Sequence, residues 1–217
     1  MVFGLVMLEN SMSEKNKKNL AKYNWLSFIY DGAVGNSLFN RARQREFELA
    51  KIQPSQRVLI VGIGTGLDLQ YIPLDAEVIG IDLSTDMLSQ ARLKAINRNT
   101  SLYEMNAEEL SFEEQSFDIV ILNLILSVVG NPGKTMAEVY RVIKPAGSIW
   151  ILGKFTEKRI GFLRKTLSFV TTAIGGANLN LSLNELIHDL PLIKVYEEKR
   201  FMTDIISLKV SGNRSSG

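Results

Sequence analysis

Cysteine is absent from the 217 residues of the sequence, which excludes disulfides, thiolate catalysis and cysteine-rich metal sites. Histidine is almost absent, and the single one, His188, cannot form a site that needs several histidine ligands. A strong charge of either sign is also lacking, because 25 lysines and arginines stand against 23 aspartates and glutamates. The resulting net charge of +2 is too small to indicate nucleic-acid binding. We therefore expect no metal site and no nucleic-acid partner.

Long hydrophobic runs are lacking as well. The apolar start, MVFGLVML, is far too short to span a bilayer and contains no basic residue of the kind that opens a signal peptide. We expect a cytoplasmic protein. The apolar fraction of 46% is sufficient, at this length, for one domain with a sizeable core. We expect a flexible segment over residues 1–18, a single domain over 19–211 and a flexible tail over 212–217.

A glycine-rich stretch organises the rest of the chain. The unbroken apolar run Val58 to Val61 predicts a strand buried on both faces of a parallel sheet. Glycines follow at alternate positions, 62, 64 and 66, and glycine permits positive φ angles and a close approach of a ligand to the backbone. Such turns also occur as plain connections between a strand and a helix. The loop is therefore a candidate binding loop, and a second feature is needed to distinguish it from a plain connection.

The second feature is an acid at the end of the next strand. The apolar run Val78 to Ile81 ends in Asp82, 20 positions after Gly62. In doubly wound folds a carboxylate at about this distance holds a ribose. A dinucleotide fingerprint would place a small residue at position 67, where a helix approaches a pyrophosphate, but Leu67 stands there. We therefore predict a crevice for a nucleoside without a pyrophosphate.

The remaining elements alternate between strand and helix, which predicts a parallel α/β sheet with right-handed crossovers. The C-terminal strands follow one another directly and predict an antiparallel edge. The fold class is therefore α/β: a Rossmann-like, doubly wound, mostly parallel seven-stranded sheet with an N-terminal helical cap. Expected strands, besides the two above, are Ser101–Met105, Phe117–Leu122, Gly147–Leu152, Leu192–Phe201 and Met202–Val210, and expected helices include Leu38–Leu49, one capped by Ser84, Lys134–Ile143 and Ser182–His188.

Two segments are candidates for the substrate side. The helical residues 19–52 are either a cap over the sheet edge or a lid that closes on a ligand. Arg41, Arg43 and Arg45 alternate within this segment, so they cannot share one helix face. Residues 156–190 form an insertion whose part 158–170 interleaves basic and apolar side chains. That part either contacts anionic lipid as a peripheral element at the inner membrane surface, covers an apolar small molecule, or is a solvated surface helix.

Four ordered motifs resemble those of class I S-adenosylmethionine-dependent methyltransferases. VLIVGIGTG is similar to the cofactor loop of this family, and IDLSTDMLSQAR to its second strand and helix. NAEELSFEEQSFDIVILN and EVYRVIKPAGSIWIL are similar to the segments around its fourth and fifth strands. The N-terminal YDGAVGNSLFNRARQREFEL resembles the phosphatidylethanolamine N-methyltransferase branch, to which quinone C-methyltransferases are near relatives.

The resemblance implies S-adenosylmethionine as cofactor and S-adenosylhomocysteine as product. It implies that Asp82 accepts hydrogen bonds from both ribose hydroxyls and that Leu83 and Met87 pack on the adenine, although both could simply belong to the core. Asn106 and Ala107 would hold the adenine edge, and Asn123 would face the reacting methyl. The cofactor-binding residues implied are Gly62, Ile63, Gly64, Thr65, Gly66, Asp82, Leu83, Met87, Asn106, Ala107 and Asn123.

Two positions depart from the family pattern. The family has an acid two residues before the first glycine, which helps hold the ammonium of the cofactor, and Ile60 stands there. The usual aspartate before Ala107 is Asn106. Ile60 keeps two alternatives open, a cyclase-like enzyme that binds the cofactor without transferring methyl, and a cofactor-binding accessory protein.

The substrate predicted from the resemblance is an apolar or amphiphilic small molecule, such as a phospholipid amine or a quinone. The N-P-P-Y signature of adenine- and amide-methylating relatives is absent after the fourth strand, where NLIL stands. A general base is required only if the nucleophile must lose a proton. Candidates for that base are His188, Tyr23 and Tyr30, and a lone histidine is more often structural.

Overall fold

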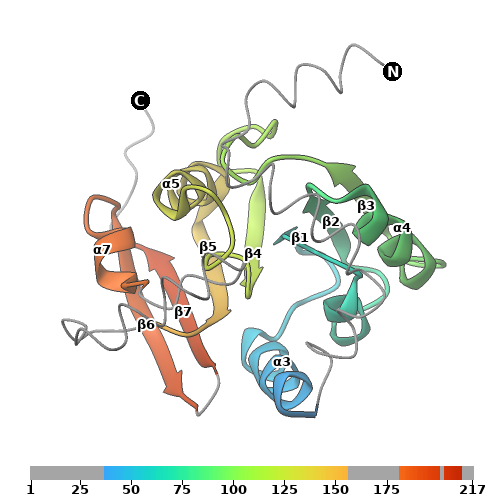
Figure 1. Ribbon diagram of the computed structural model, residues 1–217, viewed down its shortest axis with the longest axis horizontal. Coiled ribbons are helices and arrows are strands. Elements are labelled where there is room, and N and C mark those ends of the chain that lie inside the picture. The colour runs from blue at the N-terminus through green and yellow to red at the C-terminus, as the bar shows by residue number, and fades with distance from the viewer. Residues whose placement is uncertain (1–36, 156–180, 201–202, 212–217) are drawn as a thin grey trace.

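The computed structural model describes residues 37–155, 181–200 and 203–211 (Figure 1). One seven-stranded sheet runs through the described residues in the order β3-β2-β1-β4-β5-β7-β6. Strands β1 to β5 pair in parallel, whereas β7 is antiparallel to β5 and β6 is antiparallel to β7. This order confirms the predicted doubly wound fold and its antiparallel edge. The strands are β1 Arg57–Val61, β2 Glu77–Asp82, β3 Thr100–Glu104, β4 Phe117–Asn123, β5 Ile143–Gly153, β6 Leu192–Lys199 and β7 Asp204–Val210.

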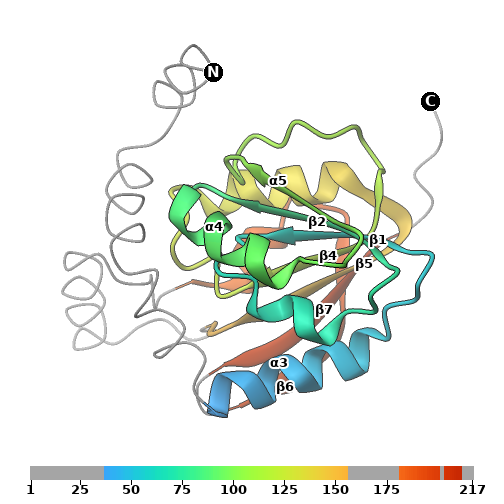
Figure 2. The ribbon, with the colours of Figure 1, turned by 90° about the vertical axis from the view of Figure 1, so that its right-hand side faces the viewer.

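Helices cover both faces of the sheet, as Figure 2 shows for α3 below it and α5 above it. The predicted Ser84 cap is present, because the Ser84 hydroxyl accepts a hydrogen bond from the Met87 amide at 3.2 Å. Ser182 caps the last described helix in the same way. The described helices are α3 Ser37–Ala50, the 3-10 helix η1 Leu67–Tyr71, α4 Thr85–Lys94, α5 Pro132–Val142 and α7 Leu183–Ile187.

The apolar residues of each strand alternate between two cores, one on each face. Val61 and Leu59 of β1 belong to the core beneath α5 and α7, whereas Val58 and Ile60 belong to the core beneath α3, η1 and α4. Each buried Val, Leu or Ile side chain contributes about 1.5–3 kcal/mol to folding. Because both faces are covered, the central strands are continuous apolar runs, which is the pattern that predicted them.

The boundary between α5 and β5 differs from the prediction. The helix begins at Pro132, with the Asn131 side chain accepting a hydrogen bond from the Lys134 amide at 3.0 Å, rather than at Lys134. Proline is favoured in the first helical turn because the missing amide hydrogen would have no partner there. The strand begins at Ile143 rather than Gly147, since Pro145 disfavours a helical conformation for the residue before it.

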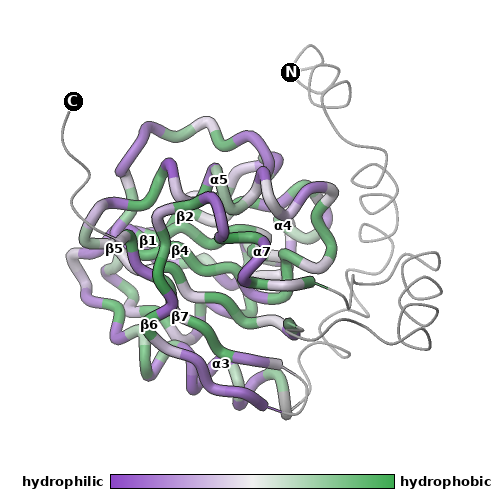
Figure 3. The backbone as a smooth tube through the Cα atoms, turned by 90° about the vertical axis from the view of Figure 1, so that its left-hand side faces the viewer, coloured by the Kyte–Doolittle hydropathy of each residue, from purple (hydrophilic) through white to green (hydrophobic). Residues whose placement is uncertain are grey.

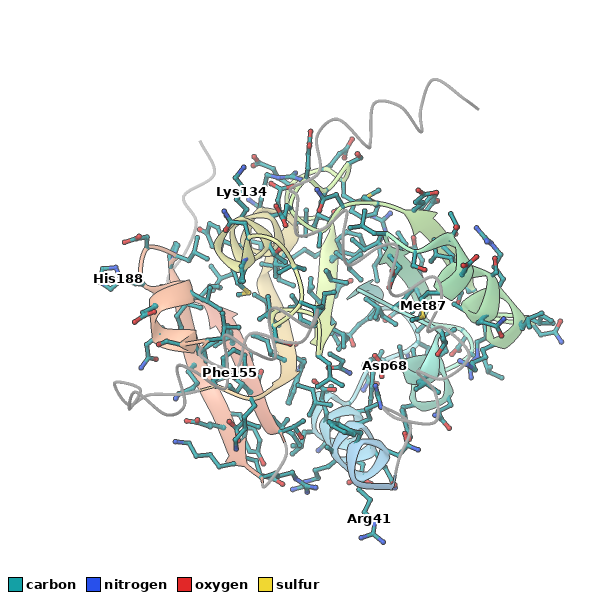
Figure 4. The ribbon with its side chains drawn as sticks, viewed as in Figure 1. Arg41, Asp68, Met87, Lys134, Phe155 and His188 are labelled. Atoms are coloured by element: carbon teal, nitrogen blue, oxygen red, sulfur yellow. The ribbon has the colours of Figure 1, made fainter. Side chains whose placement is uncertain are left out.

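The helix α3 packs on η1 and β5 at the edge of the described chain. Arg41 is exposed and points away from the molecule (Figure 4), Arg43 is buried, and Arg45 is half-buried. The prediction that these arginines do not share a face is therefore confirmed. Hydrophilic residues dominate α3 in Figure 3, in contrast to the more hydrophobic strands of the sheet. Residues 19–36 of the predicted lid and 156–180 of the predicted insertion lie outside the described residues.

In the described part of the chain, every helix is too short or too polar to cross a membrane.

Candidate functional site

The glycine loop after β1 has a left-handed backbone at each of its three glycines. The φ angles are 72° at Gly62, 55° at Gly64 and 80° at Gly66, a region that glycine adopts without steric cost. The amides of Gly62 and Ile63 both donate to the carbonyl oxygen of Ile81 at 2.9 Å. These bonds fix the loop against the end of β2, so that the loop and Asp82 face the same space.

The three glycines differ in what surrounds them. A Cβ atom at Gly62 would lie 2.6 Å from Cδ1 of Ile125, and one at Gly66 would lie 3.1 Å from the backbone of Ala91. A Cβ atom at Gly64 would meet nothing within 4 Å. Gly62 and Gly66 therefore serve the packing of the fold, whereas Gly64 borders open space that a ligand can occupy.

Asp82 is held by backbone amides. One carboxylate oxygen accepts from the Gly64 amide at 2.8 Å and the other from the Ser84 amide at 2.9 Å. Burial raises the pKa of Asp82, and the hydrogen bonds from Ser84, Gly64 and Leu83 partly offset that rise. A carboxylate has about four acceptor positions, so acceptor capacity remains for a ligand beside these three amides. This geometry is compatible with a pair of ribose hydroxyls.

An open cleft lies between the glycine loop and the ends of β1, β2 and β4. Its empty space is about 590 Å³, including the part open to solvent. The cleft lies at the carboxyl ends of parallel strands, where doubly wound folds bind ligands. Its lining consists of Arg43, Gly62, Ile63, Gly64, Thr65, Leu67, Asp68, Asp82, Met87, Asn123, Leu124, Ile125 and Val128.

The wall opposite Asp82 contains a second acid, Asp68 of η1, which Figure 4 places between η1 and α3. One carboxylate oxygen accepts from Nε of Arg43 at 2.8 Å, and the other accepts from Nδ2 of Asn123 at 3.1 Å. The three side chains are each at least nine-tenths buried. Burial raises the pKa of Asp68, whereas the charge of Arg43 and the two hydrogen bonds lower it.

Glu46 of α3 lies behind this wall with none of its surface exposed. Neither carboxyl oxygen makes a hydrogen bond of ordinary geometry, and the amide oxygen of Asn123 also lacks a partner. Burial, and then the charge of Asp68, raises the pKa of Glu46 well above its usual value, against smaller opposing effects of Asn123 and Arg43. A buried carboxylate without a hydrogen-bond donor is costly, which favours the protonated acid.

Ile60, the departure from the family pattern, is fully buried in the core beneath α3. It pairs in register with Gly80 of β2 and Ile121 of β4. A carboxylate at this position would be surrounded by apolar side chains of that core. The acid that reaches the cleft on this side is Asp68, which comes from η1 rather than from β1.

Several implied cofactor residues line the cleft, and others do not. Met87 lies in the lining and is only 3% exposed, so that it also belongs to the packed interior. Four implied residues lie outside the lining: Gly66, Leu83, Asn106 and Ala107. The segment before Asn106 is nevertheless joined to the end of β2, because the Met105 amide donates to the Asp82 carbonyl at 3.1 Å. The structure thus brings the glycine loop, Asp82, Met87 and Asn123 together.

The sequence interpretation missed Glu46 and Asp68, and it named Arg43 only as one of three arginines of the predicted lid. Arg43 and Glu46 share the buried face of α3 with Ala42 and Phe47. A charged side chain among the apolar positions of an amphipathic helix was a signal that could have identified them. Asp68, two residues after the last glycine, carried no comparable local signal.

The candidate general bases gain no support from the described structure. His188 lies beside Asp189 on the surface, with its side chain 81% exposed, and points away from the molecule in Figure 4. It is not part of the cleft lining. Tyr23 and Tyr30 lie outside the described residues. We assign His188 no catalytic role, and the candidacy of Tyr23 and Tyr30 stays a prediction.

Comparisons with known proteins agree with this geometry. Residues 59–151 match a family model described as a methyltransferase domain. The phosphatidylethanolamine N-methyltransferase of Cereibacter sphaeroides is 34% identical over 125 residues, which are 55% of this chain and 62% of that protein. The ubiquinone/menaquinone biosynthesis C-methyltransferase UbiE of Vibrio vulnificus is 31% identical over 140 residues, which are 61% of this chain and 52% of that protein. The chain therefore matches less than two thirds of the length of either relative.

Among solved structures, the [4+2]-cyclase SpnF superimposes with a TM-score of 0.74 at 15% identity, over 89% of this chain and 95% of that one. At this identity the likeness shows the fold alone. The fold predicted from the sequence thus agrees with the strand order of the structure and with this likeness.

Proposed function

We propose that the chain is a class I methyltransferase, which binds S-adenosylmethionine in the cleft and transfers a methyl group to an amphiphilic small molecule. The single observation that carries the proposal is the convergence of Asp82 and the open side of Gly64 on one cleft, within the stretch that matches the family. The match extends over residues 59–151, which include the glycine loop, all of β2, β3 and β4, and most of β1 and β5.

The residues of the cleft fit this cofactor. Asp82 keeps free acceptor positions for ribose hydroxyls, and the space beside Gly64 lets a ligand lie against the backbone. Met87 offers an apolar surface for a flat ring, as expected for adenine. Arg43 and Asp68 supply one positive and one negative group for the two ends of an amino acid. The place of the missing acid at position 60 is taken, in this proposal, by Asp68.

S-adenosylmethionine supplies an electrophilic methyl group on a sulfonium. The contribution of the chain is to hold and align, because an in-line displacement depends on the approach of the two reactants. The backbone of the glycine loop and Asp82 fix the nucleoside end, while Asp68 and Asn123 form the opposite wall. Leu124, which has a positive φ of 62°, turns the chain after β4 so that Ile125 and Val128 close the cleft.

The substrate class rests on the relatives rather than on the cleft. One relative is named for a phosphatidylethanolamine and the other for quinone biosynthesis, and both names denote molecules with a polar head and long apolar parts. We therefore propose a phospholipid amine or a quinone as the acceptor. The basic and apolar segment 158–170, whose role we predicted from sequence, lies outside the described residues and stays a prediction for the substrate side.

Calorimetric titration of the purified protein with S-adenosylmethionine and S-adenosylhomocysteine tests the cofactor site. We expect micromolar binding of both, and a loss of at least tenfold in affinity in Asp82→Ala. The matched control is Asp86→Ala, since Asp86 is exposed in the first turn of α4 and does not line the cleft. Absence of binding by the wild-type protein would overturn the proposal.

Methyl transfer itself is tested with cofactor labelled in the methyl group. Incubation with vesicles of phosphatidylethanolamine or with a demethylated quinone should move the label into the organic phase. A cyclase-like enzyme would bind the cofactor but leave the label on it, and an accessory protein would show neither product nor turnover. The Asp82→Ala variant should abolish transfer in parallel with binding.

A further inference from the structure

The buried wall behind the cleft contains more acids than bases. Among the described residues, Glu46 and Asp68 provide two carboxyl groups, and Arg43 provides the one cation that contacts them. All three side chains are nine-tenths or more buried. Arg43 forms its ion pair with Asp68 at 2.8 Å, so the pair is neutral and Glu46 is left without a counter-charge of its own.

A single proton satisfies the two groups that lack partners. Within the described part of the chain, both carboxyl oxygens of Glu46 and the amide oxygen of Asn123 are buried without a hydrogen-bond partner. Asn123 lies close enough to Glu46 to influence its pKa. A protonated Glu46 can donate to the Asn123 oxygen, whose amide nitrogen already donates to Asp68. The ligand-free wall is then neutral and links Glu46 to Arg43 through Asn123 and Asp68.

The charges that act on Glu46 are few. Asp68 of η1 raises the pKa of Glu46, and Arg43 on its own helix lowers it. Asn123 of β4 is polar but carries no charge, and the β5 residues of the same core, Trp150 and Leu152, are apolar. A positive charge brought into the cleft therefore has a direct influence on whether Glu46 ionises, because no other described charge screens it.

The two forms of the cofactor differ in this charge. S-adenosylmethionine carries an ammonium, a sulfonium and a carboxylate and has a net charge of +1. S-adenosylhomocysteine keeps the ammonium and the carboxylate but has a neutral sulfur, so its net charge is zero. The methyl cation that is transferred accounts for the difference.

We propose that Glu46 holds a proton in the ligand-free protein and releases it when S-adenosylmethionine binds, but retains it when S-adenosylhomocysteine binds. Glu46 thereby acts as a positioning residue that responds to the charge of the cofactor through Asp68 and Asn123. The inference rests on the proposed function, since it requires that the cleft binds this cofactor. Its consequence is that the ratio of the two affinities depends on pH.

Thermodynamic linkage gives the direction in which each cofactor affinity changes with pH. Binding that lowers the pKa of a group releases protons, so that the affinity rises with pH between the pKa of the complex and that of the free protein. Affinity for S-adenosylmethionine should therefore increase as the pH rises, by at most tenfold per pH unit for one proton. Affinity for S-adenosylhomocysteine should stay nearly constant, because its charge does not favour the ionised acid.

The test is calorimetry of the full chain at pH 5.5 and pH 7.5, in pairs of buffers that differ in ionisation enthalpy, which counts the protons released. We expect the wild-type protein to release more protons with S-adenosylmethionine than with S-adenosylhomocysteine. Its preference for the former should increase at least threefold between the two pH values. Glu46→Gln keeps the volume and a hydrogen-bond donor but cannot ionise, so its preference should show no such increase.

The matched control is Glu48→Gln, because Glu48 is an exposed acid two positions further along the same helix. Glu48→Gln should show the same pH dependence as the wild-type protein. Because both variants bind the same ligand, any protons that the ligand itself gains or releases contribute equally to the two measurements. Equal proton release with both ligands, or a wild-type pH dependence that persists in Glu46→Gln, overturns the inference. If the wild-type protein binds neither ligand, the proposed function has failed instead, and the two failures are thus distinguishable.

Discussion

Asp68 and Asp82 line the same cleft from opposite walls, but they are held in different ways. Asp82 accepts hydrogen bonds from the backbone amides of Gly64 and Ser84, whereas Asp68 accepts from the side chains of Arg43 and Asn123. Backbone donors are supplied by the fold whatever the side chains are. The wall of Asp82 therefore depends on the course of the main chain, and the wall of Asp68 depends on a set of individual side chains that must all be present.

The difference also concerns charge. Asp82 has no cation among the groups that set its pKa, and its raised pKa is moderated by amides. Asp68 is compensated by Arg43, with Glu46 behind it, whose raised pKa favours the protonated acid. A wall made of paired charges is sensitive to the loss of one member, while a wall made of amides is not. The following variants examine that contrast, beginning with the largest expected effect.

Removal of the cation should be the most damaging change. Arg43→Met keeps much of the apolar stem but leaves the Asp68 carboxylate buried without a counter-charge, which typically costs about 3–5 kcal/mol. The measurement is the free energy of unfolding in urea at pH 7. Asp82→Asn is the counterpart on the other wall and should cost about 1–2 kcal/mol, since one acceptor oxygen remains. Equal losses for the two variants would refute the contrast.

A second variant tests how Glu46 affects the stability of the ligand-free protein at different pH values. Because burial raises the pKa of Glu46 above its unfolded value of 4.5, the folded state holds the proton more tightly than the unfolded state. The stabilisation is complete below pH 4.5 and is lost as the pH rises, at up to about 1.4 kcal/mol per pH unit. Glu46→Gln removes this loss. Its free energy of unfolding, relative to wild type, should increase from pH 5 to pH 8.

The glycine loop offers a contrast between packing and binding. Gly62→Ala should lower the free energy of unfolding by about 2–4 kcal/mol, because the new Cβ meets Ile125 and the backbone keeps a positive φ. Gly64→Ala meets no neighbour and should cost only about 1 kcal/mol from its φ angle. Cofactor titration should show the reverse for Gly64→Ala, a large loss of affinity in a stable protein. A Gly64→Ala variant that binds normally would show that no ligand lies there.

The smallest effect on stability is expected at the amino-terminal ends of the strands, opposite the end where the cleft lies. Asp118, at the start of β4, accepts from Lys144 Nζ at 2.8 Å and from the Arg57 amide at 2.9 Å. Partial burial acts to raise the pKa of Asp118, but Lys144 and Arg57 outweigh it, so the pKa is lowered. Solvent screens this pair, and Asp118→Asn should cost about 0.5 kcal/mol above pH 4 and nothing once the wild-type carboxyl is protonated at lower pH. Cofactor affinity should not change.

The sequence predicted the side of the cleft that backbone amides hold, but not the side that individual side chains hold. The glycine loop, Asp82 and the Ser84 cap were identified because their partners lie within a few residues or at the end of the next strand. The strands were identified because burial on both faces produces continuous apolar runs. Asp68 was not identified, since its partners are 25 and 55 positions away and meet it only in the folded chain. The start of β5 was misplaced although Pro145 carried the necessary signal.

The ion pair between Arg43 and Asp68 has a consequence for the order in which the protein is made. The ribosome releases α3 before any of the segments that α3 contacts, and β5, on which it packs, ends at Gly153. At about 5–20 residues per second, the roughly 100 intervening residues take on the order of 5–20 s to synthesise. During that time the sheet beneath α3 is incomplete, although β1 and η1 are already present. The acidic wall, which also requires Asn123 of β4, is therefore completed after the glycine loop that it faces.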